Sequence, residues 1–378
     1  MDTTAIETAG GRRDAPGNAL APRGDALAPP GNDLAPRGNA LIDPQGRRID
    51  YVRLSVTDRC NYRCTYCMPA GGIDHVDRVD ILSFEEIVAI VRCFAALGVR
   101  RLRITGGEPT VRRDLVELVR RLRAIQGIEE LSLSTNGHLL AELAAPLRAA
   151  GVSRLNVSLD TLDPEKFAHI TRLGDVARVR AGIDAARAAG FSVIKTNTVA
   201  IKGFNDGEIG ALCDYAWSRG LIPRFIEQMP MAGGEMFVPG ELLPAREIRD
   251  LVVAAWPGAR LVADDGGGAG GAGPARYWRL KTSDDTSASG PARRFGIISA
   301  MTEHFCDTCN RVRLAASGAL HACLGFDDAV NLRDVLRTEG ETAVIAAIHR
   351  AISAKRPGHT FGLLGIGGPR KSMISIGG

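Results

Sequence analysis

The sequence lacks a run of about 20 apolar residues, the length that an α-helix needs to cross a bilayer, so it predicts no membrane-spanning helix. It also lacks a strong excess of one charge, because the formal net charge is only +4 over 378 residues. So small a charge argues against a protein that coats nucleic acid or binds a membrane surface, and leaves room only for a local basic pocket. The apolar fraction of 45% is that of an ordinary globular protein.

Residues 1–49 contain no aromatic residue and six of the nineteen prolines. Leucine recurs there every seven residues, but the prolines and glycines between the leucines exclude a continuous helix. The segment lacks the unbroken apolar core of a secretory signal, and its six acidic residues argue against a transit peptide. We therefore predict a disordered leader over residues 1–49 and a cytoplasmic protein.

From Tyr51 onward, short β-rich runs alternate with amphipathic helical patterns, and glycines stand between each helix and the next strand. Strands are predicted over 51–56, 100–104, 130–134, 153–158, 191–199 and 222–227, and helices over 83–97, 111–125, 139–150, 175–189 and 206–219. Six such units predict an α/β fold with a parallel sheet, a partial (βα)6 TIM-type barrel.

The chain beyond the six units has a different pattern. Two short strands, 258–263 and 276–281, are predicted to form a hairpin around the Gly-rich segment 264–275, and 331–352 is predicted to be helical. We therefore predict three regions: the leader (1–49), the barrel (50–257) and a C-terminal extension (258–378).

Six of the eight cysteines form two triplets, and neither triplet has an obvious fourth cysteine. The first, Cys60, Cys64 and Cys67, has the spacing C-x3-C-x2-C. Three thiolates can hold three corners of a [4Fe–4S] cube and leave one iron open to a small molecule, whereas structural zinc needs a fourth ligand such as His75. Cys93 and Cys213 lie in apolar helical stretches and are predicted to be packed core thiols.

The second triplet, Cys306, Cys309 and Cys323, has the spacing C-x2-C-x13-C. On spacing alone both a second cluster and a zinc site completed by His304 or His321 stay open. Arg311 and Arg313 follow at once, and at i and i+2 of an extended segment they project to one face and could fork around phosphate. Arg53, Arg103 and Lys195 are predicted to point from strands into the same cavity, which indicates a polyanionic small substrate.

The first triplet with Tyr66, together with Thr105-Gly106-Gly107-Glu108-Pro109 after the second strand, resembles the radical S-adenosylmethionine superfamily. Segments 53–60, 103–109 and 306–313 and the terminal Gly377-Gly378 extend the resemblance to the GTP 3′,8-cyclase family of molybdenum cofactor biosynthesis. The resemblance covers almost everything from Arg53 to Gly378. Ser134 stands where that family often has threonine, which keeps the hydroxyl.

The resemblance implies a reaction and its cofactors. Two [4Fe–4S] clusters are implied, the first cleaving S-adenosylmethionine to a 5′-deoxyadenosyl radical and the second binding guanine through its open iron. The radical would take H3′ of GTP, and C3′ would attack C8 to give (8S)-3′,8-cyclo-7,8-dihydroguanosine 5′-triphosphate.

The resemblance also implies site residues and partners. S-adenosylmethionine would contact Tyr66, Gly107, Ser158 and Met229. GTP would contact Arg53, Arg103, Ser134, Lys195, Arg311, Val312 and Arg313, and the Gly377-Gly378 tail would reach the pocket and present Arg313, the candidate catalytic side chain. The implied partners are a flavodoxin or ferredoxin as electron donor, a downstream pyranopterin-forming enzyme and a second copy in a homodimer.

Two other functions are compatible with the motifs. One is a radical S-adenosylmethionine enzyme that modifies a peptide and carries an auxiliary cluster. The other is a zinc-stabilised binding module without catalysis, which would contain zinc and no iron.

Overall fold

A computed structural model describes residues 40–376 of the chain except 233–236, 265–272 and 283–292. The described residues belong to one compact unit. The glycine tail, most of the predicted leader and the centre of the Gly-rich segment lie outside the described residues. Every helix in the described part of the chain is too short or too polar to cross a membrane.

The described strands form a single sheet in the order β12-β11-β10-β1-β2-β3-β4-β5-β6-β9-β8-β7. The eight strands from β10 to β9 in this order run parallel, and the two strands beyond each end are antiparallel. The strands are β1 (Tyr51–Ser55), β2 (Arg101–Thr105), β3 (Glu130–Thr135), β4 (Arg154–Ser158), β5 (Val193–Ala200), β6 (Ile222–Glu227), β7 (Arg260–Ala263), β8 (Arg276–Lys281), β9 (Arg294–Ile298), β10 (Arg311–Leu314), β11 (Ala319–His321) and β12 (Val330–Asn331).

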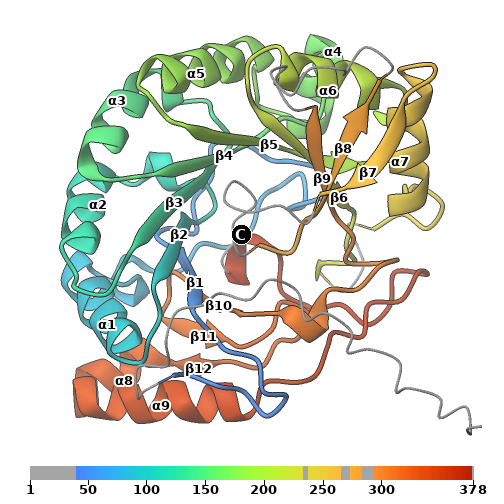
Figure 1. Ribbon diagram of the computed structural model, residues 1–378. Coiled ribbons are helices and arrows are strands. Elements are labelled where there is room, and N and C mark those ends of the chain that lie inside the picture. The colour runs from blue at the N-terminus through green and yellow to red at the C-terminus, as the bar shows by residue number, and fades with distance from the viewer. Residues whose placement is uncertain (1–39, 233–236, 265–272, 283–292, 377–378) are drawn as a thin grey trace, which may run out of the picture. The chain divides into compact units, whose positions relative to one another are not determined.

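Helices cover the outside of the curved sheet, as Figure 1 shows for the arc from α1 to α6. The helices are α1 (Phe84–Ala96), α2 (Leu115–Arg123), α3 (Leu140–Ala150), α4 (Pro164–Thr171), α5 (Val176–Ala188), α6 (Ile209–Trp217), α7 (Ala245–Ala254), α8 (Leu332–Glu339) and α9 (Glu341–Ser353). Local sequence explains where some of these helices begin and end. Ser83 and Glu86 form a capping box at the start of α1, and Gly151 ends α3 at φ 113°, a conformation that glycine adopts without strain.

The predicted partial (βα)6 barrel is confirmed, with element ends within a few residues of the predicted ones. The predicted hairpin is also present, because β7 and β8 pair antiparallel. The predicted helical stretch 331–352 is two helices rather than one, since Gly340 between α8 and α9 has φ 83°. The sequence patterns did not predict α4, α7 or β9.

Successive side chains along each strand point alternately into the core beneath the helices and into the barrel interior. On β1, Val52 and Leu54 are fully buried in the core beneath the helices, while Arg53 between them faces the other side. The same pattern recurs on β2, where Leu102 and Ile104 flank Arg103. The interior of the barrel is therefore lined by charged and polar side chains. Cys93 and Cys213 are buried in the core cluster, as predicted.

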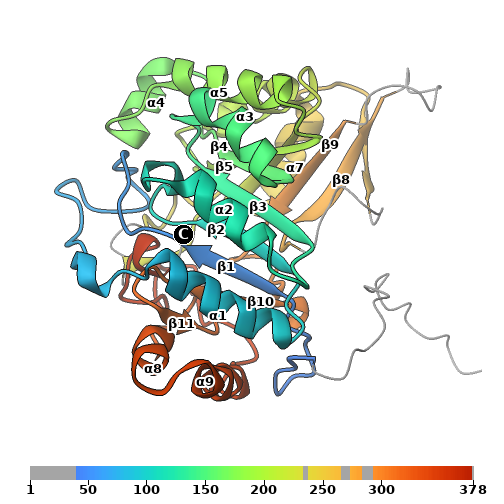
Figure 2. The ribbon, with the colours of Figure 1, turned by 90° about the vertical axis from the view of Figure 1, so that its left-hand side faces the viewer.

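The C-terminal extension continues both edges of the six-stranded barrel sheet. β9 pairs with β6 and β10 pairs with β1, both in parallel. Figures 1 and 2 show α8 and α9 beside α1 on the outside and the last described residues inside the ring of strands. The predicted boundary between residues 257 and 258 stays a prediction, because the sheet runs through it.

Residues 40–49, which we predicted as part of the disordered leader, are folded. Ile42 and Arg48 form an antiparallel bridge, and Leu41 and Ile49 are buried at 1% and 0% exposure. The prediction of disorder is therefore wrong for these ten residues. We predicted disorder because the segment has no aromatic residue and contains a proline, but Leu41 and Ile49 are buried and hold it on the core.

Candidate active site

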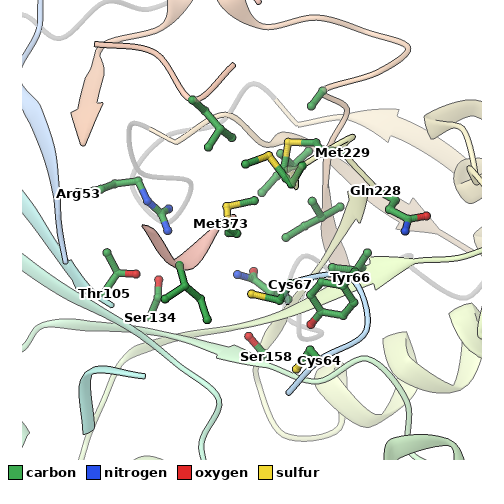
Figure 3. A pocket seen from close by; sticks show the side chains of 18 of the residues that line it. Arg53, Cys64, Tyr66, Cys67, Thr105, Ser134, Ser158, Gln228, Met229 and Met373 are labelled. Carbon is green, nitrogen blue, oxygen red and sulfur yellow. The ribbon is translucent and has the colours of Figure 1, made fainter. Parts of the chain in front are cut away.

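A cavity of about 320 Å³ lies at the carboxyl ends of the barrel strands, where parallel α/β folds place their ligands. All six cysteines of the two triplets line it. In Figure 3, Arg53 reaches in from one side, and Cys64, Cys67 and Tyr66 lie opposite. The structure thus brings together two groups of residues that stand about 250 positions apart in the sequence.

The first triplet lies in the loop after β1, and α4 holds that loop in place. The amide of Arg63 donates to the carbonyl of Thr171 at 3.0 Å, and that of Thr65 donates to Ile170 at 2.9 Å. All three thiols are free, and burial raises the pKa of Cys60 to about 11 and that of Cys67 to about 12. A metal group bound here would therefore displace protons.

Tyr66 is fixed by a carboxylate that sequence reasoning missed. Its hydroxyl donates to Asp160 Oδ2 at 2.7 Å, and the Val199 amide donates to Asp160 Oδ1 at 2.8 Å. Burial raises the pKa of Asp160 to about 6, against the lowering effect of these hydrogen bonds. Asp160 stands just after β4, so its place at a strand end was the available signal.

The glycines after β2 bring two loops of the chain together. The Gly107 amide donates to Thr57 at 2.7 Å and the Glu108 amide to Arg59 at 2.8 Å. A Cβ on Gly107 would lie 2.3 Å from the Arg59 carbonyl oxygen, so only glycine fits. The glycines thus let the β2 loop approach the segment that leads into the first triplet, as well as line the cavity.

Glu108 joins the ends of β2 and β3. Its carboxylate accepts from the Thr110 amide and hydroxyl at 3.0 and 2.5 Å, from the Thr135 hydroxyl at 2.7 Å and from the Asn136 amide at 2.6 Å. Burial raises the pKa of Glu108 despite these donors. Both oxygens are therefore engaged by the chain itself.

A row of arginines crosses the barrel interior. Arg53 on β1 is the register partner of Arg103 on β2 and of Arg313 on β10, and Arg311 stands two residues before Arg313. Burial and then the charge of Arg311 lower the pKa of Arg313 to about 10, and burial followed by Arg313 and Arg103 lowers that of Arg53. Cations gathered at such a cost favour an anionic ligand.

Arg224 on β6 is a further cavity arginine, which sequence reasoning missed. It is 2% exposed, and its Nε donates to Asn197 Oδ1 at 3.0 Å while its Nη2 donates to Asn156 Oδ1 at 2.5 Å. The available signal was a charged residue between apolar ones in the middle of a strand that ends at Glu227. Its amide partners hold the guanidinium without neutralising it.

Lys195 and Val312 lie elsewhere than predicted. Lys195 shares the interior face of β5 with Asn197, but it lies one layer deeper, 4% exposed and not lining the cavity, with its Nζ 3.1 Å from the Tyr277 hydroxyl. Burial and then Arg224 lower the pKa of Lys195 to about 6. Val312 is 1% exposed in the core, on the face of β10 opposite to the arginines, so its side chain cannot contact a ligand. The other predicted side chains, Ser134, Ser158 and Met229 among them, line the cavity.

The second triplet is held by Arg47, which lies in the part of the chain that was predicted to be a disordered leader. Its Nη1 donates to the Cys306 and Pro357 carbonyl oxygens at 2.8 and 2.6 Å, and its Nη2 donates to the Arg356 carbonyl at 2.8 Å. Within the triplet, burial opposes ionisation of Cys309, but the charges of Arg311 and Lys355 and hydrogen bonds from Arg311 lower its pKa to about 7.

The distances between the thiol sulfurs distinguish a site for an iron–sulfur cluster from a site for a single zinc ion. Tetrahedral zinc places its sulfur ligands about 3.8 Å apart. Among the described residues, neither triplet forms a group whose ligand atoms all lie within 4.8 Å of one another. His321, a predicted zinc ligand, is fully buried on β11 and belongs to no such group. The triplets therefore fit a larger group such as an iron–sulfur cluster better than one zinc ion.

Two protein-family models and several relatives match this chain. The Radical SAM superfamily model matches residues 54–216, and the Molybdenum Cofactor Synthesis C model matches residues 222–361. A Geobacter sulfurreducens protein named GTP 3′,8-cyclase is 43% identical over 338 residues, covering 89% of this chain and 99% of the relative. One of the same name from Pseudomonas entomophila is 46% identical over 324 residues, covering 85% and 93%. The crystal structure of Streptococcus suis SuiB bound to precursor peptide SuiA has a TM-score of 0.56 at 15% identity, covering 84% of this chain and 70% of that one, which shows a shared fold alone.

Proposed function

The chain belongs to the GTP 3′,8-cyclase family of the radical S-adenosylmethionine superfamily, and from this premise we propose that it converts GTP to (8S)-3′,8-cyclo-7,8-dihydroguanosine 5′-triphosphate. This is the first step of molybdenum cofactor biosynthesis. The observation that carries the proposal is the single cavity lined by both cysteine triplets and by the arginine row. A radical precursor and a polyanionic nucleotide can meet there.

The first triplet would hold three irons of a [4Fe–4S] cluster. When bound, that cluster and S-adenosylmethionine supply a 5′-deoxyadenosyl radical at the carboxyl ends of the strands. The chain positions the cofactor through Tyr66, whose ring is fixed by Asp160, and through Gly107, Ser158 and Met229 on the cavity wall.

The arginine row would bind the triphosphate. Arg53, Arg103 and Arg313 are partly buried on neighbouring strands. Burial and the neighbouring guanidinium charges lower the pKa of Arg53 and of Arg313, so an anion would offset that unfavourable environment. Arg311 also lines the cavity, and Arg224 on β6 adds a fifth guanidinium. Lys195 stays a predicted triphosphate residue, and would contribute from beneath the cavity, where it contacts Tyr277.

The second triplet would hold a second [4Fe–4S] cluster, with guanine at its open iron. Met373 and Ile374 line the cavity. Gly377-Gly378 lie outside the described residues, and their role as a tail that reaches this pocket stays a prediction from the resemblance. A flavodoxin or ferredoxin as electron donor, a homodimer and a downstream pyranopterin-forming enzyme complete the proposal as the family resemblance implies them.

An anaerobic turnover assay tests the proposed function. Reconstituted protein is incubated with reductant, S-adenosylmethionine and GTP, and both 5′-deoxyadenosine and the cyclised nucleotide are quantified. We expect formation of 5′-deoxyadenosine to depend on GTP. Deoxyadenosine formed equally without GTP, or a protein with zinc and no iron, would refute the cyclase assignment.

Arg313→Ala sharpens the test. The variant should keep the iron content of both clusters and S-adenosylmethionine binding, but lose GTP turnover, because the cavity loses a cation next to Arg53. Arg246→Ala is the matched control, since that side chain is 86% exposed on α7. Loss of iron in Arg313→Ala would assign Arg313 a structural role instead.

A further inference from the structure

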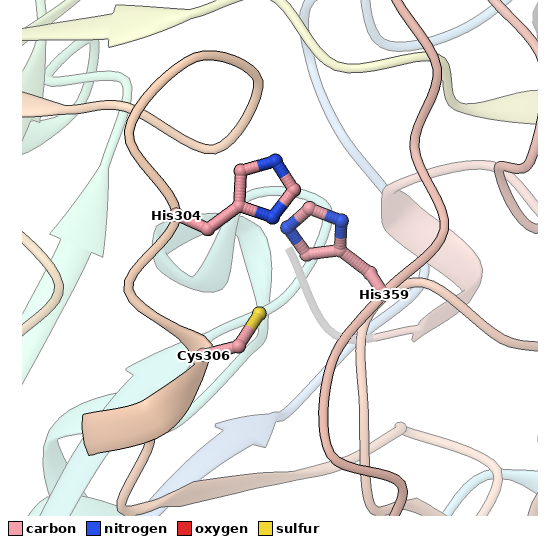
Figure 4. Close-up of side chains that lie close together, drawn as sticks. All are labelled: His304, Cys306 and His359. Atoms are coloured by element: carbon pink, nitrogen blue, oxygen red, sulfur yellow. The ribbon is translucent and has the colours of Figure 1, made fainter.

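A second group of metal-ligand side chains lies beside the second cysteine triplet. Ligand atoms of His304, Cys306 and His359 all lie within 4.8 Å of one another. Figure 4 shows a nitrogen of each histidine ring turned toward the other, with the Cys306 sulfur pointing to the same space. His304 and Cys306 come from the segment before β10, and His359 comes from the loop after α9.

The two histidine rings of this trio lie close together, and one ring nitrogen is buried. The two imidazole rings are 4.6 Å apart between centroids and tilted by 32°. His359 Nε2 is buried and has no hydrogen-bond partner among the described residues. A buried ring nitrogen without a partner is costly, and a bound metal ion satisfies it.

The donor set indicates which ion. Two imidazoles and one thiolate suit zinc, whose bonds are about 2.0–2.1 Å to nitrogen and about 2.3 Å to sulfur. Such bonds place tetrahedral ligands about 3.3–3.6 Å apart. Since the ligand atoms lie within 4.8 Å of one another, each pair must approach by about 1.5 Å at most. His304 is exposed and can make that movement. Gly358 allows the close approach of the two segments, because its Cβ position is already 3.3 Å from Cys306 Sγ.

We propose that the chain without its second cluster binds one Zn²⁺ through His304, Cys306 and His359, with water as the fourth ligand. Cys306 is common to this site and to the proposed cluster, so the two occupants exclude each other. Only this exclusion rests on the proposed function; the zinc site itself does not. Zinc at this site would delay loading of the second cluster.

Zinc titration of the full-length, cluster-free chain tests the site. Under reducing, anaerobic conditions, affinity is measured by competition with a chromophoric chelator. We expect one zinc per chain. Both His304→Ala and His359→Ala should lose at least about 10- to 100-fold in affinity, the loss seen when even a group that only orients a ligand is removed. His304→Ala is the safer variant for folding, because that side chain is exposed. His349→Ala, on the exposed face of α9, is the matched control and should not change the affinity.

The other cysteines discriminate the zinc site from the cysteine triplet. Cys309→Ser and Cys323→Ser should leave zinc affinity unchanged while preventing assembly of the second cluster. If either lowers zinc affinity as much as the histidine variants do, zinc binds the triplet and the proposal is wrong. The proposal is equally wrong if His304→Ala and His359→Ala bind zinc as tightly as the wild type. Failure of the cyclase assignment would instead be seen in GTP-dependent turnover, which this titration does not measure.

Discussion

Arg47→Ala tests whether one side chain ties three stretches of chain together at the second triplet. Its guanidinium donates to the carbonyls of Cys306, Arg356 and Pro357, and its Nε pairs with Asp43 Oδ2 at 2.5 Å. The two paired side chains are only 6% and 0% exposed. Truncation leaves a buried carboxylate without its cation and three carbonyls without a donor. We expect a loss of about 3–5 kcal/mol in the free energy of unfolding, the usual cost of removing one partner of a buried pair.

Urea unfolding of the full-length chain measures this loss, and iron analysis measures its consequence. Reconstituted Arg47→Ala should lose about half its iron, that of the second cluster, because Cys306 is no longer held. Arg47→Lys should be intermediate, since an ammonium keeps the charge but lacks the fork of five donors. Arg92→Ala is the matched control: it breaks an exposed pair with Glu341 and should cost no more than about 1 kcal/mol. A stability change in Arg47→Ala as small as the control's, with full iron, would refute the reasoning.

Three further predictions follow from buried contacts. Gly107→Ala should lose the iron of the first cluster, because its Cβ would clash with the Arg59 carbonyl; full iron content in the variant would contradict this. Lys195→Met should flatten the rise of stability with pH. The pKa of Lys195 is about 6 in the folded state, below its ordinary value, so between these two values the unfolded chain binds more protons than the folded one. The free energy of unfolding of the wild type should therefore rise by about 2 kcal/mol from about pH 6.5 to 8.5. Equal pH profiles in urea unfolding would disprove that cause. Glu227→Gln should lower stability by about 2–4 kcal/mol, since its carboxylate accepts from the amides of Ala245 and Thr302, and an unchanged urea midpoint would show that these donors find other acceptors.

The six barrel strands and the five helices between them were predictable because their pattern is local. Each strand alternates apolar and polar residues, and each helix has a long apolar face. Helix α4 was missed because two turns do not establish a period. Its importance is tertiary: its last carbonyls, those of Ile170 and Thr171, hold the loop of the first triplet. β9 was missed for a similar reason: it is a five-residue run whose parallel partner, β6, comes from much earlier in the chain.

The same distinction applies to the site. Arg53 was predicted to point from its strand into the cavity, and it lines the cavity, because alternation along a strand depends only on neighbours in sequence. Ser158, which the family resemblance implied, lines it too. The depth of a residue within a barrel is not encoded that way, which is why Lys195 was expected at the cavity and lies beneath it. Arg47 and His359 acquire their contacts from segments far away in the chain, and no local pattern indicates such contacts.

The pairing of β10 with β1 has a consequence during synthesis. β1 is among the first strands to leave the ribosome, yet Arg53 acquires its partner Arg313 only when nearly the whole chain has been made. Until then one side of β1 is an unprotected edge, rich in buried-type residues and able to pair with another nascent chain. Closing so long a loop is slow, because its entropy must be lost before the contacts form. Chains truncated before residue 311 should therefore aggregate, even though all six barrel strands are complete.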